Sequence, residues 1–150
     1  MIYLILSSLI LRNHLHLNCV QEKPNYDCQV INKLNNDKIE INFVRFNNKT
    51  WHIIFSVNGK HDSSPDKKYT LKEYVNLITL VAYVISDFCS KFNPNVLMLK
   101  GNNDKKIKIY KEIFSKIKDY YIKEHPFIKD NIMVVKKSLP ERIKNYLFNN

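Results

Sequence analysis

The sequence predicts an α+β domain, with one β-sheet and two main helices. Residues 38–57 alternate apolar and polar side chains, which is the period of half-buried strands. Residues 70–92 and 104–121 instead repeat apolar side chains at helical spacing, and a short apolar run at residues 96–99 separates them. The predicted order is therefore an antiparallel hairpin, a helix, a strand, a second helix and a last strand.

The hairpin is predicted to pair residues 39–43 with residues 51–57. Polar residues 47–49 supply the turn, and the second strand should end at Asn58 and Gly59, which are common turn residues. The following polar stretch contains a proline, so we expect a surface loop before the first helix.

The first long helix is predicted to begin at a capping box, in which Thr70 and Glu73 satisfy each other's backbone groups, and to end before Pro94. Its apolar face is so broad that neighbouring elements should cover most of the helix. The continuous apolar run at residues 96–99 is typical of a strand that is covered on both faces.

The second helix is predicted to direct an apolar stripe inward from residue 107 to residue 121, with Tyr110 in this stripe. A last strand is expected at residues 132–135, and a short final helix is expected after residue 138.

Residues 1–36 show no sustained period and are predicted to be irregular, apart from one short element at residues 28–31. The single α+β domain is therefore predicted to span residues 37–150.

The apolar run at residues 1–11 resembles the central part of a signal peptide, but no basic residue precedes it and no small-residue cleavage site follows. It is also shorter than the roughly 20 apolar residues that span a bilayer. We expect it to pack on the domain, and the sequence leaves its processing open.

The chain carries a formal net charge of +10, from 24 Lys and Arg against 14 Asp and Glu. Most of this excess is C-terminal, because residues 100–150 hold 13 basic and 6 acidic side chains. A basic surface attracts nucleic acids and other polyanions without reading a sequence. The alternative is that these lysines are only solvated, as the coding bias of an AT-rich genome would also give. The candidate polyanion-binding residues are Lys105, Lys106, Lys108, Lys111 and Lys118.

No metal site, cofactor site or catalytic constellation is predicted. His14, His16, Cys19 and Cys28 are metal-ligand types, but their spacing lacks the paired ligands of a zinc site. The three cysteines form no close-spaced framework, which favours a reduced compartment. His61 and its neighbours contain the residue types of a hydrolase triad, yet triad members come together from distant positions in the chain.

His52 is predicted to point to the outer face of its strand. An imidazole there could act as an acid or a base, but an exposed strand histidine is the simpler interpretation. With only two glycines, the chain has little material for a glycine-rich phosphate-binding loop.

Residues 91–110 resemble a group of small, mostly uncharacterised proteins from phages and Bacteroidetes. In that group a hairpin leads to a helix, a strand, a Gly-containing turn and a helix that opens with R-x-x-x-Y. Lys106 takes the place of the arginine here, and Tyr110 takes the place of the tyrosine. The similarity covers about residues 37–136 and lies more in the order of elements than in identities.

The order β-β-α-β-α is also similar to the core of the acetyl-CoA-dependent acyltransferase superfamily, in which a late helix likewise carries a tyrosine. Members of that superfamily join a strand to a helix through R/Q-x-x-G-x-G/A, whose backbone amides hold the cofactor pyrophosphate. The matching loop here, residues 59–68, has one glycine, a proline and two aspartates that would repel phosphate. The resemblance implies the fold, whereas binding of the cofactor is not expected.

The leading expectation is a non-enzymatic phage or phage-derived protein that works by binding, either in the virion or on a host protein in the cytoplasm. The sequence identifies neither this protein partner nor the oligomeric state, and no membrane partner is expected. The first alternative is a nucleic-acid-associated accessory protein that uses the basic C-terminal region. The second is a degenerate acyl-CoA-dependent acyltransferase in which Tyr110 would be the proton donor.

Overall fold

The computed structural model describes residues 17–59, 69–100, 104–123, 131–138 and 140 of the chain. These residues form one seven-stranded sheet and two helices, which confirms the predicted α+β class. The helices are α2 (Leu71–Phe92) and α3 (Asp104–Ser115). The strands are β1 (Asn18–Glu22), β2 (Asn25–Asn32), β3 (Asp37–Arg45), β4 (Thr50–Val57), β5 (Val96–Lys100), β6 (Tyr120–Lys123) and β7 (Asn131–Lys136).

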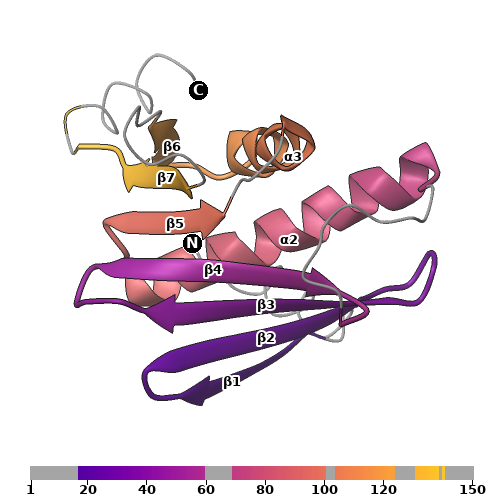
Figure 1. The fold of residues 1–150 in the computed structure, drawn as a ribbon, viewed down its shortest axis with the longest axis horizontal. Coiled ribbons are helices and arrows are strands. Elements are labelled where there is room, and N and C mark those ends of the chain that lie inside the picture. The colour runs from indigo at the N-terminus through magenta and orange to yellow at the C-terminus, as the bar shows by residue number, and fades with distance from the viewer. Residues whose placement is uncertain (1–16, 60–68, 101–103, 124–130, 139, 141–150) are drawn as a thin grey trace, which may run out of the picture.

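The strands follow the order β1-β2-β3-β4-β5-β7-β6 across the sheet (Figure 1). Every neighbouring pair is antiparallel except β4 and β5, which are parallel. A tight turn cannot join two parallel strands, and the chain here crosses over through α2. Figure 1 shows α2 passing behind the sheet, so this helix covers one of the two sheet faces.

The core lies between α2 and the sheet face that it covers. Phe43 of β3 stacks on Phe88 of α2, with ring centroids 3.8 Å apart and an interplanar angle of 7°. Trp51 of β4 meets Phe88 edge-on at 4.9 Å, and Phe92 stacks on Phe88 at 4.8 Å. Because Phe43 and Phe88 are fully buried, these ring contacts fix α2 against the central strands.

α2 begins and ends where the sequence predicts, although the Glu73 carboxylate accepts a hydrogen bond from Asn35. Thr70 is the N-cap, and its hydroxyl accepts a hydrogen bond from the backbone N–H of Glu73 at 3.2 Å. Asn93 is the C-cap in the left-handed region, with a φ of 48°, and its N–H donates to the carbonyl of Cys89 at 2.9 Å. Pro94 follows directly, where a proline cannot continue the helix.

α2 has 22 residues and is apolar enough to cross a bilayer by length and composition alone. Half of the most apolar 18-residue stretch of this helix is buried inside the protein. Its apolar character therefore has a structural explanation in the sheet that it covers.

The predicted hairpin is confirmed as β3 and β4, and the predicted strands at residues 96–99 and 132–135 are confirmed as β5 and β7. The prediction that β5 is covered on both faces is wrong. Leu97 and Leu99 are buried, whereas Val96 and Met98, on the opposite face, are only partly buried.

The prediction of an irregular segment before residue 37 is wrong for β1 and for the full length of β2, whereas the short element expected at residues 28–31 is confirmed as part of β2. These strands make a hairpin at the edge of the sheet, in which Cys19 lies directly opposite Cys28. The two cysteines form a disulfide, so the prediction that the cysteines form no framework is wrong for this pair. The remaining cysteine, Cys89, is a free thiol, and burial raises its pKa to about 12.

α3 is shorter than predicted. It ends at Ser115 and does not continue to Tyr121, because the chain turns and Asp119 adopts the left-handed region with a φ of 69°. The following residues form β6, in which Tyr120 is buried and Tyr121 is 40% exposed. The tyrosine that packs inward is therefore Tyr120, whose hydroxyl donates to the carbonyl of Pro94 at 2.6 Å.

Some predictions fall outside the described residues. They concern the apolar run at residues 1–11, His14 and His16, the loop at residues 60–68 with His61, and the final helix after residue 138.

Replacing Phe88 with alanine should lower the free energy of unfolding by about 3–5 kcal/mol, because it removes a buried ring from the contact between α2 and the sheet. Denaturant unfolding followed by the fluorescence of Trp51 measures the change. Phe46→Ala is the control, since this ring is 71% exposed and its loss should change stability by less than about 0.5 kcal/mol. Equal losses in the two variants would contradict the described core.

Candidate functional site

The pairing between β4 and β5 stops before β4 ends. The last register partners are Ile53 and Leu99, while β4 continues to Val57 with β3 as its partner. Figure 1 shows β4 running on past the end of β5, and no described strand pairs with residues 54–57 on that side. The N–H and C=O groups along this edge can therefore pair with an extended ligand, as strand edges do in peptide recognition.

Tyr110 lies on α3, the helix that follows β5 in the chain. Its side chain is 7% exposed and shares a helix face with Ile113 and Phe114, which are also buried. This confirms the prediction that Tyr110 belongs to the buried stripe of the second helix. Burial raises the pKa of Tyr110 above its usual value of 10.0, so the hydroxyl stays protonated throughout the neutral range.

A buried carboxylate connects the two ends of the segment between β4 and α2. Asp37 is 2% exposed and accepts hydrogen bonds from the side-chain amides of Asn58 at 2.9 Å and Asn35 at 3.0 Å. Burial and a hydrogen bond to Asp37 raise the pKa of Tyr69 to about 12. Since Asn58 follows β4 and Tyr69 precedes α2, Asp37 fixes where the chain leaves the strand and where it enters the helix.

The first turn of α2 is engaged by the protein itself. Thr70 caps the backbone N–H of Glu73, the Glu73 carboxylate accepts from Asn35 at 3.4 Å, and the Glu73 carbonyl accepts from Asn32 at 3.4 Å. Asn32 is fully buried and also accepts a hydrogen bond from Asn76 at 2.7 Å. A pyrophosphate at this helix end would meet a carboxylate and an N–H that is already capped. The described residues therefore do not fit the phosphate-binding site of the acyltransferase superfamily.

A second tyrosine joins the two helices. The hydroxyl of Tyr74 in α2 donates to Glu112 Oε2 in α3 at 3.0 Å. Burial, followed by this hydrogen bond, raises the pKa of Tyr74 to about 12. Tyr74 and Glu112 line a groove between α2 and α3, and their hydrogen bond holds α3, which carries Tyr110, against α2.

The structure separates the five candidate polyanion-binding lysines. Lys105, Lys108 and Lys111 are exposed on α3, and Lys118 is exposed in the turn after this helix. Lys106 is only 8% exposed and lies on the buried side of α3, so it does not belong to the basic surface. Binding of a nucleic acid or of a protein partner to the exposed lysines stays a prediction.

No group of three or more His, Cys, Asp or Glu side chains in the described part of the chain could hold a metal ion. Two of the side chains considered as metal ligands in the sequence, Cys19 and Cys28, form a disulfide with each other. His52 is partly exposed between buried Trp51 and Ile53, which confirms that it points to the outer face of β4.

Sequence reasoning missed Asp37, Asn58 and Tyr69. Asn58 was expected only as a turn residue, and no role was expected for Asp37 or Tyr69. Their contacts link the beginning of β3 with the end of β4 and the start of α2, so no local pattern contains them. The available signal was weak, namely polar residues at both ends of the predicted hairpin.

No family model and no curated protein matches the sequence. Among solved structures, the chain is similar to the N-acetyltransferase PseH of Campylobacter jejuni, with 18% identity, coverage of 91% of this chain and 82% of that chain, and a TM-score of 0.46. It is also similar to a mutant of the spermidine N-acetyltransferase SpeG of Vibrio cholerae. That comparison gives 14% identity, coverage of 93% of this chain and 75% of that chain, and a TM-score of 0.46.

A likeness at this level of identity and TM-score concerns the arrangement of helices and strands alone. The prediction that the protein is not an enzyme is contradicted by this finding, because each of these structures is an N-acetyltransferase. An origin in phages or Bacteroidetes gains no support from the comparisons, and neither does a role as a phage binding protein.

Tyr74→Phe should lower the free energy of unfolding at neutral pH. This difference from the parent protein should disappear at alkaline pH. The folded-state pKa of Tyr74 is about 12 against an ordinary 10.0, so the folded chain holds this proton more tightly than the unfolded chain does. The resulting stability is complete below pH 10 and is lost as the pH rises toward about 12.

Near neutrality the Tyr74→Phe variant should be less stable than the parent by about 1 kcal/mol, for one lost hydrogen bond. Urea unfolding of both proteins from neutral to alkaline pH measures the difference, which should shrink above pH 10. Tyr121→Phe is the control, because this side chain is exposed and its substitution should have little effect at any pH. A Tyr74 difference that stays constant with pH would contradict the contact with Glu112.

Proposed function

We propose that the protein is an acyltransferase that moves an acyl group from a pantetheine thioester to an amine. The observation that carries this proposal is the geometry at the end of β5, where the edge of β4 becomes free and the chain continues into the helix that carries Tyr110. The strand edge can hold the thioester arm, and Tyr110 can supply the acid that the leaving sulfur needs.

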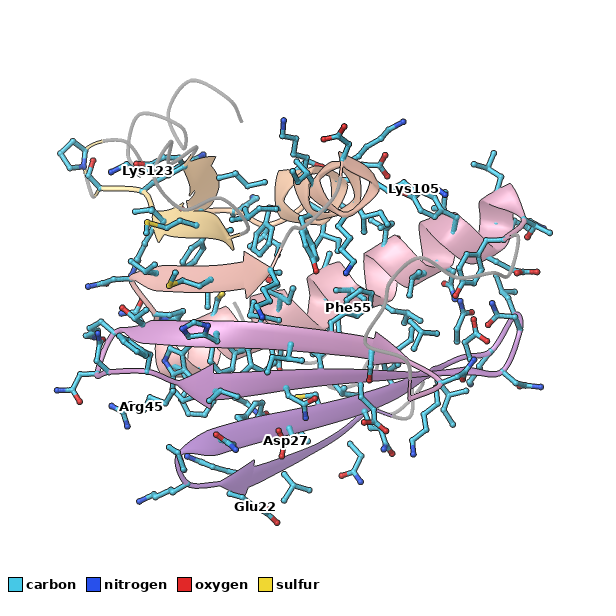
Figure 2. The ribbon with its side chains drawn as sticks, in the orientation of Figure 1. Glu22, Asp27, Arg45, Phe55, Lys105 and Lys123 are labelled. Carbon is cyan, nitrogen blue, oxygen red and sulfur yellow. A yellow bond between two sulfur atoms is a disulfide. The ribbon has the colours of Figure 1, made fainter. Side chains whose placement is uncertain are left out.

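The pantetheine arm of coenzyme A is an extended chain with amide groups. These amides can pair with the backbone of residues 54–57 in β4, as an added strand would. Figure 2 labels Phe55 in this part of β4 and Lys105 at the start of α3, both beyond the end of β5. Because such pairing uses backbone groups, it requires no particular side chain and leaves no motif in the sequence.

The transfer needs a proton for the leaving group. The amine nitrogen attacks the thioester carbonyl, a C–N bond forms, and the C–S bond breaks with the electron pair on sulfur. The hydroxyl of Tyr110 donates its proton to that sulfur, and the proton that the amine loses returns through solvent to the phenolate. The raised pKa of Tyr110 keeps the phenol in its acid form at neutral pH until charge develops on the sulfur.

The nucleotide part of coenzyme A should add little to binding, because the described start of α2 offers a capped N–H and the Glu73 carboxylate. Acetyl-CoA and acetyl-pantetheine should therefore stabilise the protein similarly, by about 2.7 kcal/mol at 100 times the dissociation constant. Thermal unfolding with each compound measures this. Stabilisation by acetyl-CoA alone would contradict the role of the strand edge, and stabilisation by neither would contradict the proposed function.

Tyr110→Phe should lower kcat/KM by about 10²–10⁴, the usual contribution of a positioned acid. Its free energy of unfolding should change by only about 1 kcal/mol, since the ring remains in the core. Release of free thiol from acetyl-CoA is measured with a panel of primary amines that includes spermidine. Tyr121→Phe serves as the matched control and should turn over at the parent rate. Parent-like turnover by Tyr110→Phe would remove Tyr110 from the reaction, and no turnover by the parent protein would contradict acyl transfer.

A further inference from the structure

The sheet face opposite α2 carries a row of three side chains with soft metal-binding atoms. His52 of β4 is the register partner of Met98 of β5, and Met98 is the register partner of Met133 of β7. The three residues are therefore direct neighbours across three adjacent strands. The whole chain contains only three methionines, and two of them lie in this row.

All three side chains point away from the core. Successive residues of a strand point to opposite faces, and the residues next to each member of the row are buried. His52, Met98 and Met133 are themselves partly exposed, and Figure 1 shows α2 behind the sheet, on the other face. The buried neighbours are Trp51, Ile53, Leu97, Leu99, Ile132 and Val134.

The spacing of the row allows one ion to reach all three side chains. Neighbouring strands lie about 4.8 Å apart, so the Cα atoms of His52 and Met133 are roughly 10 Å apart, with Met98 between them. Methionine is long, unbranched and free to rotate about three bonds, so both thioethers can turn toward a point above Met98. The strand pairing already fixes the backbone, and only side-chain rotamers remain to be ordered on binding.

We infer that His52, Met98 and Met133 bind a soft monovalent cation, Cu(I) or its redox-inert analogue Ag(I), through one imidazole nitrogen and two thioether sulfurs. Thioethers select Cu(I) over harder divalent ions, and imidazole is a good copper ligand as well. Zinc sites in proteins use thiolate, imidazole and carboxylate ligands, so a pair of thioethers disfavours zinc. This inference does not depend on the proposed acyl transfer.

Methionine methyl groups labelled with ¹³C give a direct test by NMR. The titration uses Ag(I) in a Cys89→Ala background, which removes the free thiol as a competing ligand. The signals of Met98 and Met133, assigned with Met98→Leu and Met133→Leu, should both shift and should saturate at one equivalent together with the ring signals of His52. The signal of Met1 is the internal control and should not change. A shift of only one methionine signal, or of neither, would overturn the inference.

Affinity measurements on variants complete the test. Met98→Leu, Met133→Leu and His52→Gln should each weaken Ag(I) binding by at least about tenfold, as loss of a ligand or its support does in metal sites. Leucine is close to methionine in volume, so both leucine variants should keep the fold. His125→Gln, which changes a histidine outside the row, should bind Ag(I) like the parent. Unchanged affinity in either leucine variant, or binding of Zn(II) as tight as that of Ag(I), would contradict the site.

Discussion

The parallel pairing of β4 with β5 is the constraint on which the rest of the structure depends. Two parallel neighbours need a long crossover, and the helix that supplies it must lie on the sheet. This explains why α2 is both long and apolar, and why Phe88 stacks so closely on Phe43. The same pairing ends at Ile53 and Leu99, so it also creates the free edge of β4 and sets the point from which the chain continues to Tyr110. Core and candidate site thus have one common cause.

The buried Asp37 complements this arrangement with polar contacts. A carboxylate in an apolar interior is unfavourable unless its oxygens are satisfied, and Asp37 has hydrogen bonds from Asn35, Asn58 and Tyr69. These partners come from the turn before β3, the end of β4 and the start of α2. The carboxylate therefore holds three segments of the chain together. The crossover is therefore fixed at its entrance by polar contacts and along its length by aromatic packing.

Local patterns predicted the elements whose causes are local. The two-residue period predicted β3 and β4, and the pair Thr70 and Glu73 predicted the start of α2, because the cap needs only residues of one turn. The end of α3 could not be predicted in this way, since apolar spacing continues past Ser115 and the left-handed turn residue is Asp119, where a glycine would have been the usual signal. β1 was missed, and β2 was expected only as a short element at residues 28–31, because polar Asn25 and Asn32 stand at the ends of a strand whose buried side is Tyr26, Cys28 and Val30.

The candidate site was less predictable than the fold, for a related physical reason. A free strand edge is a property of where pairing stops, and the row of His52, Met98 and Met133 is a property of register across three strands. Neither property can be recognised from a short stretch of sequence. The continuous apolar run of β5 predicted burial on both faces, but alternation places Met98 on the face opposite Leu97 and Leu99. The hydrophobicity of β5 therefore predicted its central place in the sheet. Only the register shows that Met98 lies between His52 and Met133.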